Sequence, residues 1–188
     1  MAMPAVAHYW TPDEVRALPD DGNRYEVVAG ELLVTPAPKL PHQEAVGRLY
    51  LILREYLGRV SIGHVLFSPA DLTPEPGALV QPDLFVVPLI LGRRPRDWTD
   101  IGELLLAVEI LSPSTARADR TVKRRLYQRA GVAEYWIVDL EARLVERWRP
   151  NDERPEVLTE ELSWQPDAGA TPLLVSLGSF FKQVFDEA

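Results

Sequence analysis

A continuous apolar segment that contains one acidic residue is the feature that most limits how this chain can fold. Residues 103–111 read Glu-Leu-Leu-Leu-Ala-Val-Glu-Ile-Leu, so the run is interrupted only by Glu109. Runs of this kind usually form strands in the middle of a sheet that is covered on both faces. Because a buried carboxylate is costly unless a partner compensates it, Glu109 requires an explanation.

A second carboxylate stands 26 residues earlier, at the start of another apolar segment. Asp83 follows Gln81-Pro82 and begins a predicted strand over residues 83–88. If the two strands end on the same side of the sheet, Asp83 and Glu109 converge there, with the backbone carbonyl of Ile110 beside them. Two carboxylates and a carbonyl are enough for Mg²⁺, which prefers oxygen ligands and keeps several waters. The pattern predicts a magnesium or manganese site of Asp83, Glu109 and Ile110, which is typical of nucleases.

A lysine in the following helix supplies a candidate cation for this site. Asp119, Lys123 and Tyr127 are spaced by four residues, which places Lys123 on the inner face of a helix predicted over about 118–130. The chain has 17 arginines and only three lysines, so a lysine here is less easily explained as general positive charge. Lys123 is expected to orient the nucleophile or neutralise developing charge. Since it is not a proposed ligand, its replacement by alanine is expected to leave the fold intact.

The same helix carries a stripe of arginines. Residues 117–129 include five arginines, one lysine and one aspartate, a local net charge of +5 in a chain whose formal charge is -8. A strongly acidic chain does not coat nucleic acid, so any contact must be local. Arg117, Arg120 and Arg124 are therefore the candidate nucleic-acid-binding residues, although a solvated helix face is the alternative.

The remaining elements follow from periodicity and breaking residues. We expect a short helix over 12–18, a hairpin of strands 25–28 and 31–35 around Ala29-Gly30, and a helix from Pro41 to Leu57 ended by Gly58. His42 lies on the apolar stripe of that helix and is a possible accessory residue. Further strands are expected over 61–72, 134–139 and 144–149, one short strand within 150–172, and an apolar tail over 173–185.

Length and composition suggest one domain over residues 1–188. The chain is 46% hydrophobic, with five tryptophans and no cysteine, which excludes disulfides and thiolate metal sites. No apolar run approaches the length of a membrane span, and the start lacks the pattern of a signal peptide. A cytoplasmic location without membrane contact is the default expectation.

Several separated motifs together resemble one known family. They are Tyr25-Glu26 with Gly30-Glu31-Leu32, then Pro38 and His42, Gln81-Pro82-Asp83-Leu84, residues 108–115 (Val-Glu-Ile-Leu-Ser-Pro-Ser-Thr), Asp119, Lys123, Tyr127, and residues 131–139. Their order and spacing resemble the Uma-two family of the PD-(D/E)XK restriction-endonuclease-like superfamily, over about residues 20–150. The wider superfamily has a lysine two residues after the glutamate. Leu111 occupies that place here, whereas in the resembled family the lysine lies in the following helix, as Lys123 does.

The resemblance implies an α/β restriction-endonuclease-like fold, with a mixed central sheet flanked by helices and an N-terminal β-hairpin. It also implies a Mg-dependent endonuclease that hydrolyses DNA phosphodiester bonds through Asp83, Glu109 and Lys123. Two alternatives stay open: a catalytically silent nucleic-acid-binding or protein-interaction module, and a toxin-like or mobile-element-associated accessory protein that does not act on DNA. A serine hydrolase is disfavoured, because Ser112 and Ser114 lack a Gly-x-Ser-x-Gly elbow.

A homodimer is also expected, since a two-fold pair presents two sites to the antiparallel strands of a duplex. The apolar tail over 173–185 and the strand over 134–139 are the candidate contact surfaces.

Overall fold

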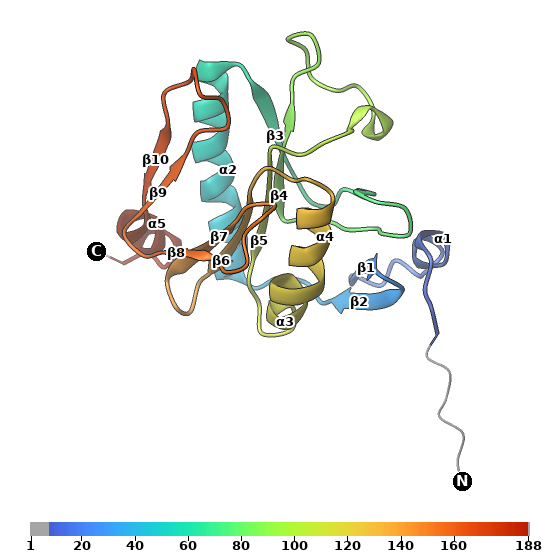
Figure 1. Cartoon of the computed structure of the whole chain (residues 1–188). Coiled ribbons are helices and arrows are strands. Elements are labelled where there is room, and N and C mark those ends of the chain that lie inside the picture. Colours follow the sequence, from blue (N-terminus) through green and yellow to red (C-terminus); the bar gives the residue numbers. More distant parts are fainter. Residues whose placement is uncertain (1–7, 188) are drawn as a thin grey trace.

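A six-stranded mixed sheet forms the centre of the molecule (Figure 1). The computed structural model describes residues 8–187. The strands, in spatial order, are β3 (Gly63–Phe67), β4 (Leu84–Pro88), β5 (Leu106–Ile110), β6 (Tyr135–Asp139), β7 (Leu144–Trp148) and β8 (Glu156–Leu158). The pair β5 and β6 is parallel and the other neighbours are antiparallel. The predicted α/β architecture with a mixed central sheet is confirmed.

Helices cover the sheet on both faces, which explains the continuous apolar strands. On one face, α2 (Leu40–Val60) and α5 (Leu177–Val184) pack on Leu84, Val108 and their neighbours. On the other, α4 (Arg124–Arg129) packs through Leu126 and Tyr127. Figure 1 shows α2 and α4 on opposite sides of the strands. All five residues of β5 are buried, as its unbroken apolar sequence predicts.

The long helix α2 continues past the glycine expected to end it. Gly58 lies within the helix, which ends only where Ser61 adopts a left-handed conformation with φ of 56°. Tyr56 and Leu57 are buried in the core on the last turns. Their packing outweighs the roughly 1 kcal/mol that an internal glycine costs relative to alanine. No described helix, α2 included, has the length and apolarity needed to cross a membrane.

The N-terminal elements form a small layer beside the sheet. α1 (Pro12–Arg16) begins with a capping box between Thr11 and Glu14, and the hairpin consists of β1 (Arg24–Val28) and β2 (Glu31–Thr35). Both elements were expected, although α1 is shorter than predicted. The helix packs through Val15, which clusters with the hairpin and the segment before β4. Residues 1–7, on which part of the signal-peptide expectation rests, lie outside the described residues.

The predicted helix over 118–130 is a composite. It consists of α3 (Ala116–Ala118), a π-helical turn η2 (Asp119–Lys123) and α4, after which Gly131 has φ of 72°. A π-helical turn is wider than an α-helical one and is frequent at functional sites. It lies directly across from the end of β5, where Glu109 is found.

Two strand predictions were inaccurate. The strand expected over 61–72 stops at Phe67, and a cis peptide bond joins Ser68 and Pro69 immediately afterwards. The segment 150–172 contains two strands instead of one, β8 and β9 (Glu161–Trp164), and β9 pairs with β10 (Leu173–Ser176). β8 is short and mostly exposed, and in β9 polar residues alternate with the buried Leu162 and Trp164, so the sequence indicated only one strand here. A short 3-10 turn, η1 (Trp98–Asp100), lies in the loop before β5.

The surfaces predicted for dimer contact are largely buried within the chain. β6 lies inside the sheet, with β5 on one side and β7 on the other, so it has no free edge. In the apolar tail, Leu177, Phe180, Phe181 and Val184 of α5 are buried in the core. Their apolar character serves the core of the single chain, and the structure does not support them as contact surfaces.

Packing between α2 and the sheet should dominate the stability of the fold. Leu53 is fully buried, whereas Leu51 on the same helix is 64% exposed. Replacing Leu53 by alanine should lower the free energy of unfolding by about 2–5 kcal/mol, because it removes buried methyl groups and leaves a cavity. Urea denaturation measures this change. Leu51→Ala is the matched control and should change stability by less than about 0.5 kcal/mol; equal losses in both variants would contradict the packing described here.

Candidate active site

Asp83 and Glu109 face each other across two antiparallel strands. Leu84 of β4 is paired with Val108 of β5. Because the strands are antiparallel, Asp83, the residue just before β4, lies opposite Glu109. Both carboxylates are buried, with 4% and 2% of their residue surfaces exposed. The two side chains therefore converge at one end of the sheet, as the sequence predicts.

Three donors hold the carboxylate of Asp83. Arg24 Nη1 donates to Oδ1 at 2.9 Å, the backbone N–H of Ile110 donates to Oδ2 at 2.8 Å, and His42 Nε2 lies 3.0 Å from Oδ2. Burial alone would raise the pKa of Asp83, but the hydrogen bond from His42 and the charge of Arg24 lower it to about 2. Asp83 is thus ionised at neutral pH. The expected accessory residue His42 contacts the site directly.

Two side chains of the composite helix, from η2 and α4, contact the carboxylate of Glu109. Lys123 Nζ lies 2.9 Å from Oε1, and the hydroxyl of Tyr127 donates to the same oxygen at 3.3 Å. Lys123 also lies 2.8 Å from Glu26 Oε2 and 3.5 Å from Asp119 Oδ1. One buried ammonium group is therefore surrounded by three buried carboxylates, and the cluster carries excess negative charge when all are ionised.

Burial and charge act on these groups in opposite directions. Burial raises the pKa of Glu109 well above its ordinary value, against the attraction of Lys123, and Asp119 and Asp83 raise it further. The pKa of Asp119 is raised by burial in the same way. Burial would lower the pKa of Lys123, but its three carboxylate neighbours raise it, so the lysine stays protonated. Because carboxylates outnumber the lysine, a cation bound beside them would favour their ionised forms.

Glu26 is a member of this cluster that was not identified from the sequence as a site residue. It is fully buried on β1, and besides Lys123 it binds the backbone N–H of Gln81 through Oε1 at 2.7 Å. It therefore connects the lysine to the segment that carries Asp83. Its signal was present in the sequence, as a glutamate within the β-prone segment 25–28. Arg24, two residues earlier, was missed as well.

A cavity of about 310 Å³ opens over the two carboxylates. Asp83, Glu109 and His42 line it together with the strap Pro36-Ala37-Pro38 and the loop 112–115 that leads into α3. Lys39, an exposed cation at the start of α2, also borders it. Lys123 is not among the described residues that line the cavity. The lysine lies behind Glu109, and the carboxylates are what a ligand in the cavity would meet.

The donor set fits a hard divalent cation. A carboxylate has about four lone-pair sites, and Asp83 uses three of them for Arg24, His42 and Ile110. Oε2 of Glu109 accepts no hydrogen bond from any described residue. The described part of the chain has no cluster of three or more His, Asp or Glu side chains arranged as a metal cage. Magnesium does not need one, because one or two carboxylates with waters and a substrate phosphate suffice.

The predicted arginine stripe is largely engaged within the protein. Arg120 binds Asp139 at 2.8 Å and Glu146 at 2.7 Å. The guanidinium of Arg124 lies 4.6 Å from the centre of the Trp148 ring. Arg117 is exposed and forms no ion pair with a described residue, so of the three it is the one best placed to reach a phosphate.

The burial of Lys123 argues against one expectation from the sequence. Only 1% of its side chain is exposed, and three carboxylates depend on its charge. Removing one partner of a buried ionic cluster leaves uncompensated charges, which strongly destabilises a fold. Lys123→Ala is therefore not a neutral change for folding, as it would be for a lysine at the surface of a helix.

Comparisons with known proteins agree with this architecture. The family model Uma2, described as "Putative restriction endonuclease", matches residues 12–174. The crystal structure titled as a putative nuclease belonging to DUF820 from Anabaena variabilis ATCC 29413 aligns with a TM-score of 0.74 at 21% identity. The alignment covers 93% of this chain and 99% of that chain. No curated protein matches the chain. The predicted restriction-endonuclease-like fold is confirmed.

The raised pKa of Glu109 leads to a prediction about stability and pH. A carboxyl whose pKa is higher in the folded than in the unfolded protein adds stability below its ordinary value of 4.5, and loses this contribution as pH rises towards the folded value. Glu109→Gln has no carboxyl group at this position, so the variant does not lose this contribution as the pH rises. The free energy of unfolding of the variant should therefore rise relative to that of the parent between pH 5 and pH 8, by at most about 1.4 kcal/mol per pH unit.

Urea denaturation across this pH range measures the difference. Glu161→Gln, at an exposed position on β9, is the matched control for the loss of one carboxylate, and it should differ from the parent less than Glu109→Gln does. A constant difference between Glu109→Gln and the parent from pH 5 to pH 8 would show that Glu109 does not titrate in this range.

Proposed function

The chain belongs to the Uma2 family, and from this premise we propose that it is a magnesium- or manganese-dependent endonuclease that hydrolyses phosphodiester bonds in DNA. The observation that carries the proposal is the convergence of Asp83 and Glu109 in the lining of one cavity, beside a buried cluster in which three carboxylates surround a single lysine. Structural ion pairs usually balance, so an excess of carboxylates that opens on a cavity is better explained by a bound cation.

Asp83 and Glu109 are the side chains that would hold the metal. Asp83 is ionised and keeps one free lone pair, and Glu109, which lines the same cavity, has no described hydrogen-bond donor at Oε2. A divalent cation bound there would polarise the scissile phosphate and acidify a water molecule. Ile110 has a second role besides that expected for its carbonyl, since its N–H fixes the orientation of the Asp83 carboxylate.

Lys123 acts in this proposal as a positioning residue. Its ammonium group holds Oε1 of Glu109, which leaves Oε2 directed to other partners. The sequence predicted that Lys123 orients the nucleophile or neutralises developing charge directly. Its burial behind Glu109 supports an effect through the glutamate instead, by orienting the carboxylate and offsetting part of its charge. Arg24 and His42 do the same for Asp83 from the other side.

The exposed cations around the cavity are placed to attract the DNA backbone. Lys39 borders the cavity, and Arg117 follows the loop 112–115 that forms its wall. Because the chain as a whole is acidic, this local positive charge would set where the phosphates bind. Arg120 is already neutralised by two carboxylates and is expected to contribute less.

Cleavage of plasmid DNA tests the proposal. The parent should nick supercoiled plasmid in the presence of Mg²⁺ or Mn²⁺ and stop when a chelator removes the metal. Glu109→Gln should lower the rate by roughly a hundredfold or more, because it removes a charged ligand whose metal stabilises the transition state. Glu161→Gln keeps the same net charge change away from the cavity and should cut as the parent does.

The outcomes separate the candidate functions. A parent protein that binds DNA but cuts it with no divalent metal would favour the silent nucleic-acid-binding module. Metal-dependent cleavage that survives in Glu109→Gln would reject the assigned site, although not a nuclease activity elsewhere.

A further inference from the structure

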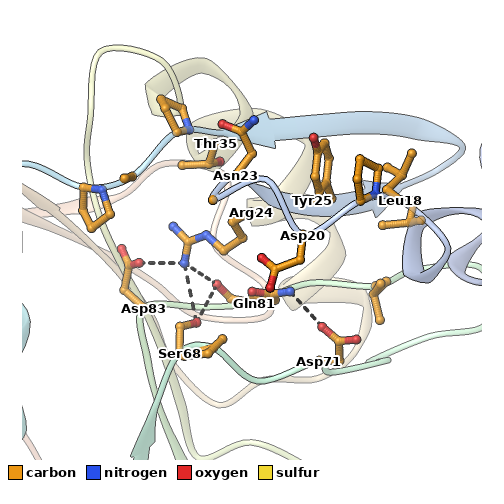
Figure 2. Close-up of a pocket in the computed structure, with 18 of the residues that line it drawn as sticks. Leu18, Asp20, Asn23, Arg24, Tyr25, Thr35, Ser68, Asp71, Gln81 and Asp83 are labelled. Carbon is orange, nitrogen blue, oxygen red and sulfur yellow. Dashed lines mark hydrogen bonds and ion pairs between the residues drawn. The ribbon is translucent and has the colours of Figure 1, made fainter.

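A second and larger hollow, of about 630 Å³, adjoins the site (Figure 2). It is bounded by the loop between α1 and β1, by residues around Ser68 and by the segment before β4. Arg24, Thr35, His42, Asp83 and the strap Pro36-Ala37-Pro38 line both hollows. The two hollows therefore meet at Asp83. A polymeric ligand that crosses the site can place one of its groups in the smaller hollow and the next in the larger one.

On the wall of the larger hollow that Asp20, Asp71 and Gln81 form, the side chains present hydrogen-bond acceptors to the space. Asp20 forms no hydrogen bond or ion pair with a described residue, and Figure 2 shows its carboxylate directed towards Gln81. The amide nitrogen of Gln81 donates to Asp71 Oδ1 at 2.8 Å, so the carbonyl oxygen of that amide is left to accept. A ligand that fits this wall must supply N–H donors.

The cations nearest to this wall are already engaged. Arg24 donates to Asp83, to the backbone oxygen of Gln81 at 2.8 Å and to Ser68 at 3.5 Å. Arg16 binds Asp13 at 3.1 Å and lies 3.9 Å from Asp71. With acidic side chains exposed and the guanidinium groups paired, the hollow disfavours a phosphate and favours an uncharged group.

The rest of the lining is apolar and includes one aromatic ring. Leu18, Pro19 and Leu79 contribute aliphatic surface to the lining. The half-buried ring of Tyr25 lies near Leu18 (Figure 2). The hydroxyl of Tyr25 donates to Asp21 at 2.7 Å, which fixes the orientation of the ring. Fixed aromatic rings beside aliphatic surface are suited to flat ligands, and bases stack on them.

We propose that the larger hollow binds the base of the nucleotide next to the scissile phosphate, and that it prefers bases with an exocyclic amino group over thymine. The inference rests on the proposed function, which places the scissile phosphate at Asp83. Carboxylates accept from the amino group of cytosine, whereas thymine presents a carbonyl oxygen in its place, for which the wall of Asp20, Asp71 and Gln81 has no matching donor. The side-chain donors of Asn23 and Thr35 lie beside Arg24, away from Asp71 (Figure 2). A base can enter the hollow only after leaving its stack, so single-stranded or locally unpaired DNA is the substrate class.

Binding of labelled oligonucleotides without metal tests the inference while preventing metal-dependent cleavage. Homopolymers of deoxycytidine, deoxyadenosine and thymidine, and an abasic strand of equal length, are titrated with the protein and followed by fluorescence anisotropy. The cytosine and adenine strands should bind about fivefold or more tightly than the thymine strand, the lower end of what one good base contact provides. The abasic strand should bind no better than the thymine strand.

Asp20→Asn converts an acceptor of the wall into a group that can also donate. It should reduce the preference for cytosine over thymine at least about threefold, since an amide can pair with thymine oxygens. Asp13→Asn is the matched control, because it makes the same charge change on a 95% exposed side chain of α1 outside the hollow. It should leave the preference unchanged.

Equal affinity of the parent for all three homopolymers, or the same response in Asp20→Asn and Asp13→Asn, would overturn the base site. Plasmid cleavage by the same preparation separates this failure from that of the proposed function. Metal-dependent cleavage without base preference rejects the base site alone. Base preference without cleavage supports the hollow as a base site and rejects the nuclease, and absence of both strand binding and plasmid cleavage rejects both.

Discussion

The ion cluster around Lys123 is the interaction on which the rest of the site depends. One ammonium group lies 2.8 Å from Glu26 on β1, 2.9 Å from Glu109 on β5 and 3.5 Å from Asp119 in η2. It therefore joins the N-terminal hairpin, the central sheet and the composite helix at one point. Glu26 extends the connection to the backbone of Gln81, two residues before Asp83. Both candidate metal ligands are thus positioned by a network with its centre at one lysine.

The contribution of such a cluster to folding stability does not by itself explain its presence. Buried ion pairs contribute little net stabilisation, and apolar side chains of similar volume often stabilise a core better. Here the carboxylates outnumber the lysine, and burial raises the pKa of Glu109 and of Asp119. Asp83 is different, because Arg24 and His42 keep it ionised. An arrangement with one firmly ionised carboxylate and a second that a cation would ionise is more readily explained by metal binding than by folding.

The strands of the sheet and the positions of Glu109 and Lys123 could be predicted from the sequence, because both depend on local patterns. An apolar strand with one glutamate indicates Glu109, and spacing by four along a helix places Lys123 inward. Arg24 and Glu26 escaped prediction because their partners lie far along the chain, at Asp83 and Lys123. Only the packed hairpin brings them together, and no periodicity encodes that packing.

The predicted DNA-binding stripe shows the opposite limit. The arginines do lie on one helix, but Arg120 faces Asp139 and Glu146, and Arg124 faces Trp148. Strands that follow the helix in the chain therefore neutralise the charge of Arg120 and cover the guanidinium group of Arg124. The end of α2 is a second example. Gly58 was expected to end this helix, but the packing of Tyr56 and Leu57 carries the helix past it. In both cases tertiary contacts override a local signal.

Metal binding at the two carboxylates is tested most directly by crystals soaked with Mn²⁺ and measured for anomalous scattering. We expect one peak between Asp83 and Glu109 in the parent, at the floor of the cavity that both line. The peak should be lost in crystals of Glu109→Gln. A parent without a peak at this position, or a variant that keeps it, would contradict a metal site built from these two residues.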